Sequence, residues 1–243
     1  MQEAYRILPC GDRAVSVEFG NKADIETNTK VRTFNNKLKE AEIEGITETI
    51  PTYRAVMIHY DPIKLSYHQL VDSIDAVGRN IVWNALKESD EVIRIPVLYA
   101  AEGSEIQQVA EYEHKSIEEI IRIHSNSRHY VFMLGFSPGG SYIGCPDGSF
   151  TIPRKATPTQ RPYTGSLGIQ TNQSNISAFG GPSGWWSIGR TPVLSFDKRR
   201  EDPILFKPGQ WVEFYPITLE QFDEIQKRVE EMTYEPEIYH RGE

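Results

Sequence analysis

Residues 180–196 read GGPSGWWSIGRTPVLSF, and this run shows the pattern that decides the fold of the second half of the chain. Glycine and proline recur every few residues from position 130 to position 216, and the runs between them are short and β-like. Many short strands with frequent turns predict a β-barrel or a β-sandwich. We expect strands at 130–136, 166–170, 185–188, 192–196 and 211–215, and a functional surface between Phe132 and Trp211.

The first part of the chain alternates expected strands and helices. Residues 13–19 alternate apolar and polar side chains, which suits a half-buried strand. Apolar residues in 24–40 and 66–79 recur near helical spacing. The full order is strand 13–19, helix 24–40, strands 46–51 and 55–60, helix 66–79 and strand 92–98. This βαββαβ order is ferredoxin-like, with two helices on one face of an antiparallel sheet.

Three more helices are expected around the barrel region. A linker at 100–103 precedes helices at 105–112 and 116–124, and a helix at 218–232 closes the chain. Ser116 and Glu119 have the spacing of a capping box, which satisfies free amides at a helix start. The expected fold class is α+β, with a ferredoxin-like domain at 1–99 and a β-barrel domain with flanking helices at 100–243.

Composition narrows the classes of function. The 243 residues carry a formal net charge of -8, which argues against broad nucleic-acid binding. The chain start lacks the apolar run of a signal peptide, and no stretch of about 18 apolar residues predicts a membrane span. Cys10 and Cys145 are too few for a disulfide framework and lack metal-ligand spacing. We therefore expect a cytoplasmic protein with free thiols and no metal.

Two loops of the barrel region carry residues suited to ligand binding. The run GFSPGG at 135–140 lets backbone approach a ligand closely, although it lacks the Lys-Ser/Thr end of a phosphate loop. A tight turn is the alternative interpretation. The segment 152–168 holds Arg154, Lys155 and Arg161 among hydroxyl side chains, a set that suits a carboxylate or phosphate. An ordinary basic loop is the alternative there.

The third candidate loop contains Trp185, Trp186 and Arg190. Adjacent residues on a strand point to opposite faces, so one Trp is expected in the core and the other is free to wall a pocket. The guanidinium of Arg190 follows closely enough to clamp an anion, while simple structural packing is the alternative. His124 ends an expected helix, where a cation is favoured by the helix dipole. No metal-ligand or serine-hydrolase motif is present.

Ordered motifs along residues 7–217 make the chain resemble one family. They are Gly11-Asp12-Arg13-Ala14, Val17-Glu18-Phe19-Gly20, Pro51-x-Tyr53-Arg54, His59-Tyr60-Asp61-Pro62, Ile95-Pro96-Val97, His124, Met133-Leu134-Gly135-Phe136-x-Pro138-Gly139, Pro153-Arg154-x-Ala156-Thr157-Pro158, Gly165-Ser166-x-Gly168-Ile169, Gly184-Trp185-x-x-Ile188-Gly189-Arg190-Thr191-Pro192 and Phe206-x-Pro208-Gly209. The chain is similar to the KipI/PxpB family, which includes the B-type component of 5-oxoprolinase and allophanate hydrolase subunit 1 and is also called carboxyltransferase subdomain A/B.

The resemblance implies that the second domain is a cyclophilin-like β-barrel. It also implies a homologous cyclophilin-like partner subunit of the PxpC/KipA type and a third subunit of the PxpA type. Such a complex is an ATP-dependent 5-oxoprolinase, which opens 5-oxo-L-proline to glutamate. Two alternatives come with the family: a carboxyltransferase component acting on a urea-like amide, and a regulatory inhibitor that binds a sensor histidine kinase. Peptidyl-prolyl isomerase activity is a further alternative that rests on fold analogy alone.

The chain departs from the family pattern in the expected pocket loops. Ser137, Gly140 and Ser141 replace Leu, Phe and Pro of the usual motif, and Thr159 stands where the family has an arginine. The usual Val-Pro-Ala before Gly165 is Pro-Tyr-Thr, and Gly-Pro-Ser stands before Gly184 in place of Ser-Pro-Gly. These departures suggest altered substrate choice or loss of catalysis. The lost arginine slightly favours the regulatory alternative.

The resemblance and the loops together suggest roles for single residues. We expect Arg154, Lys155 and Arg190 to bind a carboxylate, phosphate or acyl-phosphate. The amides near Gly139 and Gly165 are expected to donate to an oxyanion. The remaining expected roles are substrate orientation by Thr157 and Ser166, a pocket wall from Trp185 and proton transfer by His124. The resemblance implies ATP, bound with the partner subunit, as the co-substrate.

Overall fold

The computed structural model describes residues 5–85, 88–145, 150–161 and 163–242, with the side chains of Asn84 and Arg161 excepted. The chain divides into two compact units, Met1–Glu88 and Ser89–Glu243. The sequence-based boundary after residue 99 is corrected, because the strand β5 (Glu91–Tyr99) pairs with strands of the second unit and with none of the described strands of the first.

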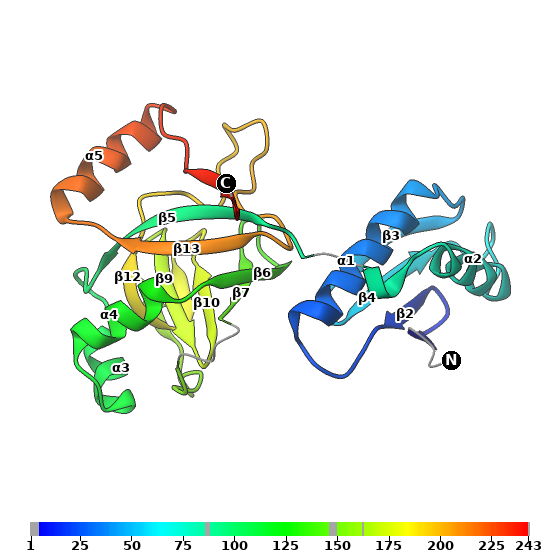
Figure 1. Cartoon of the computed structure of the whole chain (residues 1–243), viewed down its shortest axis with the longest axis horizontal. Coiled ribbons are helices and arrows are strands. Elements are labelled where there is room, and N and C mark those ends of the chain that lie inside the picture. Colours follow the sequence, from blue (N-terminus) through cyan, green and yellow to red (C-terminus); the bar gives the residue numbers. More distant parts are fainter. Residues whose placement is uncertain (1–4, 86–87, 146–149, 162, 243) are drawn as a thin grey trace. The chain divides into compact units, whose positions relative to one another are not determined.

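The first unit is a sheet in the order β1-β2-β4-β3 with two helices (Figure 1). Its elements are β1 (Arg6–Pro9), β2 (Ala14–Glu18), α1 (Ile25–Glu40), β3 (Ile46–Pro51), β4 (Ala55–Tyr60), α2 (Tyr67–Arg79) and a 3-10 turn at Trp83–Ala85. Its core joins Phe34 of α1 and Ile74 of α2 to the inward side chains of β2 and β4. The two helices therefore cover one face of the sheet, as the ferredoxin-like prediction requires.

The helix starts of this unit follow from their capping residues. The Asp24 side chain accepts a hydrogen bond from the Thr27 amide at 2.8 Å, and α1 begins at the next residue. Ser66 and Gln69 form a reciprocal capping box at the start of α2. Each cap satisfies amides that have no partner inside the helix. Local sequence alone is thus sufficient to position both helix starts.

The edge strand of the first unit differs from the prediction. A ferredoxin-like βαββαβ unit would place its last strand beside the first, and the sequence suggested residues 92–98 for that role. Instead β1 pairs antiparallel with β2, with Ile7 opposite Val17. A short strand that precedes the motif therefore occupies the edge left by β5, which belongs to the barrel.

The second unit is a closed barrel (Figure 1). Its strands follow the order β12-β9-β10-β7-β6-β13-β5, and pairing of β12 with β5 closes the ring. The bounds are β6 (His129–Leu134), β7 (Ser141–Gly144), β9 (Ser166–Gln170), β10 (Gln173–Ile176), β12 (Trp186–Arg190) and β13 (Trp211–Pro216). β14 (Ile238–His240) pairs with β5 outside the ring, and β8 (Thr159–Arg161) pairs with β11 (Gly181–Ser183) as a separate ribbon. Closure leaves no free edge within the ring.

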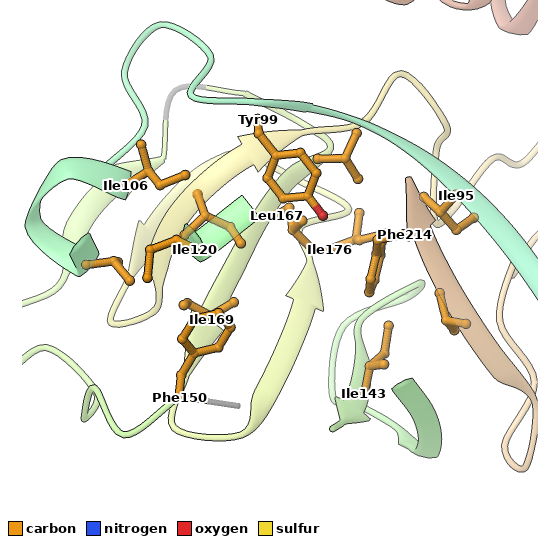
Figure 2. Packing of buried hydrophobic residues seen from close by; sticks show 14 of the residues in the cluster. Ile95, Tyr99, Ile106, Ile120, Ile143, Phe150, Leu167, Ile169, Ile176 and Phe214 are labelled. Atoms are coloured by element: carbon orange, nitrogen blue, oxygen red, sulfur yellow. The ribbon is translucent and has the colours of Figure 1, made fainter. Parts of the chain in front are cut away.

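Aliphatic and aromatic side chains fill the barrel. Figure 2 shows Ile143, Leu167, Ile169, Ile176 and Phe214 in this core, together with Ile120 from a neighbouring helix. That helix is α4 (Ile117–Asn126), which follows α3 (Ile106–Glu113), and α5 (Leu219–Glu230) comes after the last ring strand. No helix of the described ranges combines the length and apolarity needed to cross a membrane.

One expected barrel strand is wrong. Residues 192–196 form no strand, and only an isolated bridge joins Phe196 to Ile204. Conversely, β7 and β10 were not predicted, because their serines, asparagine and glycine obscure the apolar alternation. Both strands are held by pairing with neighbours, Ser174 of β10 lying opposite Ile143 of β7.

Candidate functional site

The predicted site residues do not gather in one pocket. Strands β12 and β9 pair antiparallel, with Trp186 opposite Ile169 at one end and Arg190 opposite Ser166 at the other. Four residues of strand separate these ends by about 13 Å. Arg154 and Lys155 lie at the Trp186 end, where the Lys155 amide donates to the Gly184 carbonyl at 2.8 Å. The expected single anion pocket is therefore split along the barrel.

Lys155 is not free to bind a substrate. Its Nζ contacts both carboxylate oxygens of Glu105, at 2.6 and 2.7 Å, and the hydroxyl of Thr159. The lysine side chain is 6% exposed and lies over the Trp186 ring at 5.2 Å. Burial raises the pKa of Glu105, but hydrogen bonds from Lys155 and the Ser187 amide outweigh it and lower the pKa overall. The ion pair keeps the Glu105 carboxylate ionised and neutralises the Lys155 ammonium, which is then not available to a ligand.

Two glutamates of the α3 region anchor the basic loop. Glu105 precedes α3 and binds Lys155, as described above. Glu113 ends α3, and its Oε1 accepts the amides of Thr151 at 2.7 Å and Ile152 at 2.8 Å. The sequence did not predict a role for these glutamates, because the residues around each one do not indicate a partner about forty to fifty residues away. They are positioning residues for the loop.

The other residues of this loop region are exposed or structural. Arg154 and Thr157 are exposed, and the Arg154 side chain lies so close to Gly184 that a Cβ there would be 2.7 Å from its Nε. Trp185 is 8% exposed and belongs to the core, whereas the neighbouring Trp186 donates from its indole to the Pro153 carbonyl. The structure therefore buries Trp185 rather than opening it to a ligand, and the partly buried Trp186 packs against the barrel core.

Gly165 and Ser166 have structural partners at the Arg190 end. The Gly165 amide donates to the Ser177 carbonyl at 2.7 Å, so it is not available to an oxyanion. With φ of +82° and a Cβ position 2.2 Å from the Thr191 carbonyl oxygen, only glycine fits there. Ser166 is 2% exposed and donates to the Tyr163 carbonyl at 3.0 Å. Both residues thus shape the turn that holds Tyr163 beside Arg190.

Gly139 lies in a separate loop of the barrel. Its φ is +73°, and an added Cβ would be 2.6 Å from the Cβ of Phe196. Close packing explains the glycine at this position. The structure does not bring Gly139 together with the other predicted site residues, so its expected amide role stays a prediction.

Arg190 is the predicted residue with the geometry of a binding group. Its guanidinium lies 4.3 Å from the ring centre of Phe222 and 4.6 Å from that of Tyr163. Among the described residues it has no hydrogen-bond or ion-pair partner, and its Nε is fully buried. Aromatic rings stabilise a cation over their faces but leave its in-plane N–H donors unused. These donors suit a planar carboxylate.

The Arg190 cleft has a volume of about 330 Å³. Its lining comes from the barrel and from α5, and comprises Tyr163, Thr164, Arg190, Thr191, Pro192, Leu194, Arg199, Phe222, Gln226, Val229 and Glu230. Arg199 is a second cation here, yet all three of its nitrogens have acceptors on Asp197, Val229 and Glu230. The hydrogen bond from Arg199 lowers the pKa of Asp197 to about 2. Arg190 is thus the cation that the described cleft leaves for a ligand.

A larger cleft in the first unit has a different character. It measures about 620 Å³ and includes Tyr5, Arg6, Asp75 and Trp83. Tyr5 donates to Asp75 at 2.9 Å, and Arg6 pairs with Glu18 at 2.7 Å. Arg79 also lines this cleft, but no predicted site residue lies there, so we take the Arg190 cleft as the candidate site. No metal-binding group of His, Cys, Asp and Glu occurs among the residues described.

His124 lies in the barrel core, away from the Arg190 cleft. It is 0% exposed, with Nδ1 at 2.7 Å from the Tyr99 hydroxyl and Nε2 at 3.0 Å from the Ser174 hydroxyl. Burial, with the nearby His129, lowers the pKa of His124 well below its usual range. Both ring nitrogens are occupied and no described cleft reaches them, so the expected role as a catalytic base is corrected to a structural one.

The buried His124 predicts acid sensitivity of the barrel. The unfolded chain binds a proton at this histidine below about pH 6.5, while the folded chain resists it, so stability falls as pH falls. We expect the barrel to unfold about 1.4 kcal/mol more easily at pH 5.5 than at pH 8 through this group. Urea titrations of a Trp83→Phe background, whose remaining tryptophans all lie in the barrel unit, measure this. His124→Gln should flatten the dependence, and an unchanged slope would contradict it.

The sequence profile of the carboxyltransferase domain, subdomain C and D, matches residues 5–206. The chain belongs to this family. The resemblance drawn from the motifs is therefore confirmed, with the subdomain letters corrected from A/B to C and D.

Members of this carboxyltransferase-domain family occur alone and within longer chains. The B-type component of 5-oxoprolinase from Bacillus subtilis (strain 168) is 30% identical over 228 residues, which cover 90% of this chain and 95% of that protein. Urea amidolyase of Saccharomyces cerevisiae is 26% identical over 94% of this chain but only 14% of its own length. The crystal structure of TTHA0988 has a TM-score of 0.73 at 27% identity, covering 85% of this chain and 40% of that one.

Sequence reasoning missed the aromatic partners that define the cleft. Tyr163 belongs to the Pro-Tyr-Thr departure from the family pattern, and Phe222 is an apolar residue on a predicted amphipathic helix. An apolar residue at helical spacing predicts core packing, so nothing local indicated contact with a cation. The carboxyltransferase-domain profile also ends at residue 206, before α5.

Proposed function

We propose that this chain is the B-type component of a 5-oxoprolinase and holds the substrate carboxylate in the Arg190 cleft. The observation that carries the proposal is likeness to the B-type component of the Bacillus subtilis 5-oxoprolinase along nearly the full length of both chains. The cleft supports it, because a small cyclic acid needs one cation and apolar walls. Arg190 supplies the first, and Tyr163 and Phe222 supply the second.

In this function the chain contributes binding and orientation. The guanidinium of Arg190 would take the carboxylate in its plane, which fixes the ring of 5-oxo-L-proline against the two aromatic faces. The lactam carbonyl would then point out of the cleft. Because His124 is enclosed in the core, the groups that attack the lactam are proposed to come from the partner subunits.

ATP is proposed to bind with the partners as well. The 135–140 loop lacks the lysine of a phosphate loop, and Lys155 and Arg199 are already neutralised by Glu105 and Asp197. This loop and these two cations therefore give no reason to place the triphosphate on this chain. A B-type component presupposes other subunits, and the proposed partners are the homologous cyclophilin-like subunit and the third, PxpA-type subunit.

The test is reconstitution of the complex. The chain should co-purify with the homologous partner subunit, and the full assembly should convert 5-oxo-L-proline to glutamate only when ATP is present. Glutamate release is measured with each subunit omitted in turn as a control. An intact complex with no ATP-dependent glutamate release would disprove the proposed function.

The likeness to urea amidolyase supports a second candidate function, that of a carboxyltransferase component. That relative contains the region of this chain as a small part of a much longer protein. The two candidates differ in their substrates, a cyclic acid in one case and an uncharged urea-like amide in the other. The free cation of Arg190 favours the acid. Replacing 5-oxo-L-proline by urea and carboxybiotin in the reconstituted assay separates them.

A further inference from the structure

We infer that Glu230 on α5 is a specificity-determining residue that accepts a hydrogen bond from an N–H beside the ligand's carboxylate. The inference rests on the proposed function and concerns the same cleft. It assigns the ligand class as an acid whose α-carbon carries a nitrogen with a hydrogen, such as a lactam acid or an amino acid. A plain carboxylic acid would satisfy only Arg190.

The helix geometry places Glu230 on the wall of the cleft. Residues 222, 226 and 230 are spaced by four, and such residues lie on one face of a helix. Phe222, the first of them, is buried and packs on the Arg190 guanidinium at 4.3 Å. Gln226 and Glu230 line the same cleft. The face of α5 that begins against Arg190 therefore continues along the cleft to Glu230.

The hydrogen bonds on this face of α5 leave one carboxylate oxygen of Glu230 available as an acceptor. The Gln226 amide donates from Nε2 to Oε1 of Glu230 at 3.0 Å, which orients the carboxylate. Among the described residues, no donor is recorded on the second oxygen, Oε2. Arg199 holds the last turn of α5 by donating to the main-chain carbonyls of Val229 and Glu230. The Glu230 carboxylate therefore lies at a helix end that Arg199 holds through hydrogen bonds.

The two walls of the cleft are chemically complementary. The barrel wall offers the unpaired donors of Arg190, and the helix wall offers the carboxylate of Glu230. A ligand that carries an anion and an N–H donor on one carbon matches both walls. In 5-oxo-L-proline these groups are the carboxylate and the lactam N–H. A lactone of the same ring has oxygen in place of N–H. Its ring oxygen would face the Glu230 carboxylate, and because both are acceptors no hydrogen bond would form.

The walls also differ in their relation to the family. Tyr163 and Arg190 lie within residues 5–206, which match the carboxyltransferase-domain profile, whereas Gln226 and Glu230 lie beyond it. Arg190 therefore lies in the matched domain, whereas the acceptor wall and the Phe222 ring are carried by α5, in the segment that follows.

The test compares two ligands of the same shape. Binding of 5-oxo-L-proline and of its lactone isostere, 5-oxotetrahydrofuran-2-carboxylate, is measured by NMR titration of the full chain and by competition in the assembled complex. We expect about a tenfold preference for the lactam, the size of one hydrogen bond to a charged acceptor at a partly exposed site. Glu230→Met should remove the preference, and Glu230→Gln, which keeps an acceptor oxygen, should retain part of it.

Glu231→Gln is the matched control. Glu231 is exposed, adjacent in sequence and paired with Lys227 at 4.0 Å, and it does not line the described cleft, so its variant should keep the tenfold preference. Equal binding of lactam and lactone by the unaltered chain overturns the inference, as does loss of preference in Glu231→Gln. A preserved preference without ATP-dependent glutamate release would disprove only the proposed function. If the single chain binds neither ligand while the assembled complex turns over 5-oxo-L-proline and the lactone competes equally well, the inference is overturned and the proposed function is not.

Discussion

Arg190→Met is expected to weaken binding of 5-oxo-L-proline by about a hundredfold, because it removes the cation that the described cleft leaves unpaired. Methionine preserves an unbranched apolar stem between Tyr163 and Phe222. The loss should appear in kcat/KM of the reconstituted complex and in direct titration of the single chain. Arg190→Lys should recover part of the affinity, since a lysine keeps the charge but not the planar fork.

The control for this prediction is stability. The Arg190 side chain makes no hydrogen bond to the described residues, so replacing it removes mainly the two ring contacts. The free energy of unfolding should fall by about 1 kcal/mol. A substrate affinity that is unchanged in a folded Arg190→Met variant would contradict the assignment of the cleft.

Glu105→Ala is expected to destabilise the barrel unit by about 3 kcal/mol, the lower end of the cost of breaking a buried ion pair. The change leaves the ammonium of Lys155, whose side chain is 6% exposed, without its carboxylate and also frees the Ser187 amide. The value lies at the lower end because the Glu105 side chain is itself 19% exposed and water can partly replace it. Urea unfolding monitored by barrel tryptophans gives the measurement.

The double variant Glu105→Leu/Lys155→Met separates charge from packing. Replacing both partners by apolar residues removes the unpaired charge, so the double variant should be more stable than Glu105→Ala. If Glu105→Ala costs under about 1 kcal/mol, or if the double variant is no better, the pair does not anchor the loop.

Local sequence predicted the elements of this fold where one element's own residues were enough. The caps at Asp24 and Ser66 mark the starts of α1 and α2, and the apolar spacing after them predicts both helices. The strand at residues 166–170 was predicted with its final bounds. Strands with polar sequences, such as β10, were missed because their neighbours rather than their own residues hold them.

The candidate site was predicted only in part. Arg190 was singled out from the sequence, and the structure leaves it unpaired in a cleft among the described residues. Lys155 was chosen by the same reasoning, and the structure pairs it with Glu105. Charge type alone cannot separate these cases, because a cation's availability depends on which carboxylates the fold brings to it.

The α+β class, the family and the position of Arg190 between Phe132 and Trp211 follow from local periodicity, turn residues and ordered motifs. In contrast, long-range contacts of the folded chain place β5 in the barrel and enclose His124 beside Tyr99 and Ser174. They also place Phe222 and Tyr163 beside the guanidinium of Arg190. The physical reason is that strand pairing, burial and charge neutralisation join residues distant in sequence, and these contacts are not encoded in the pattern around any one of them.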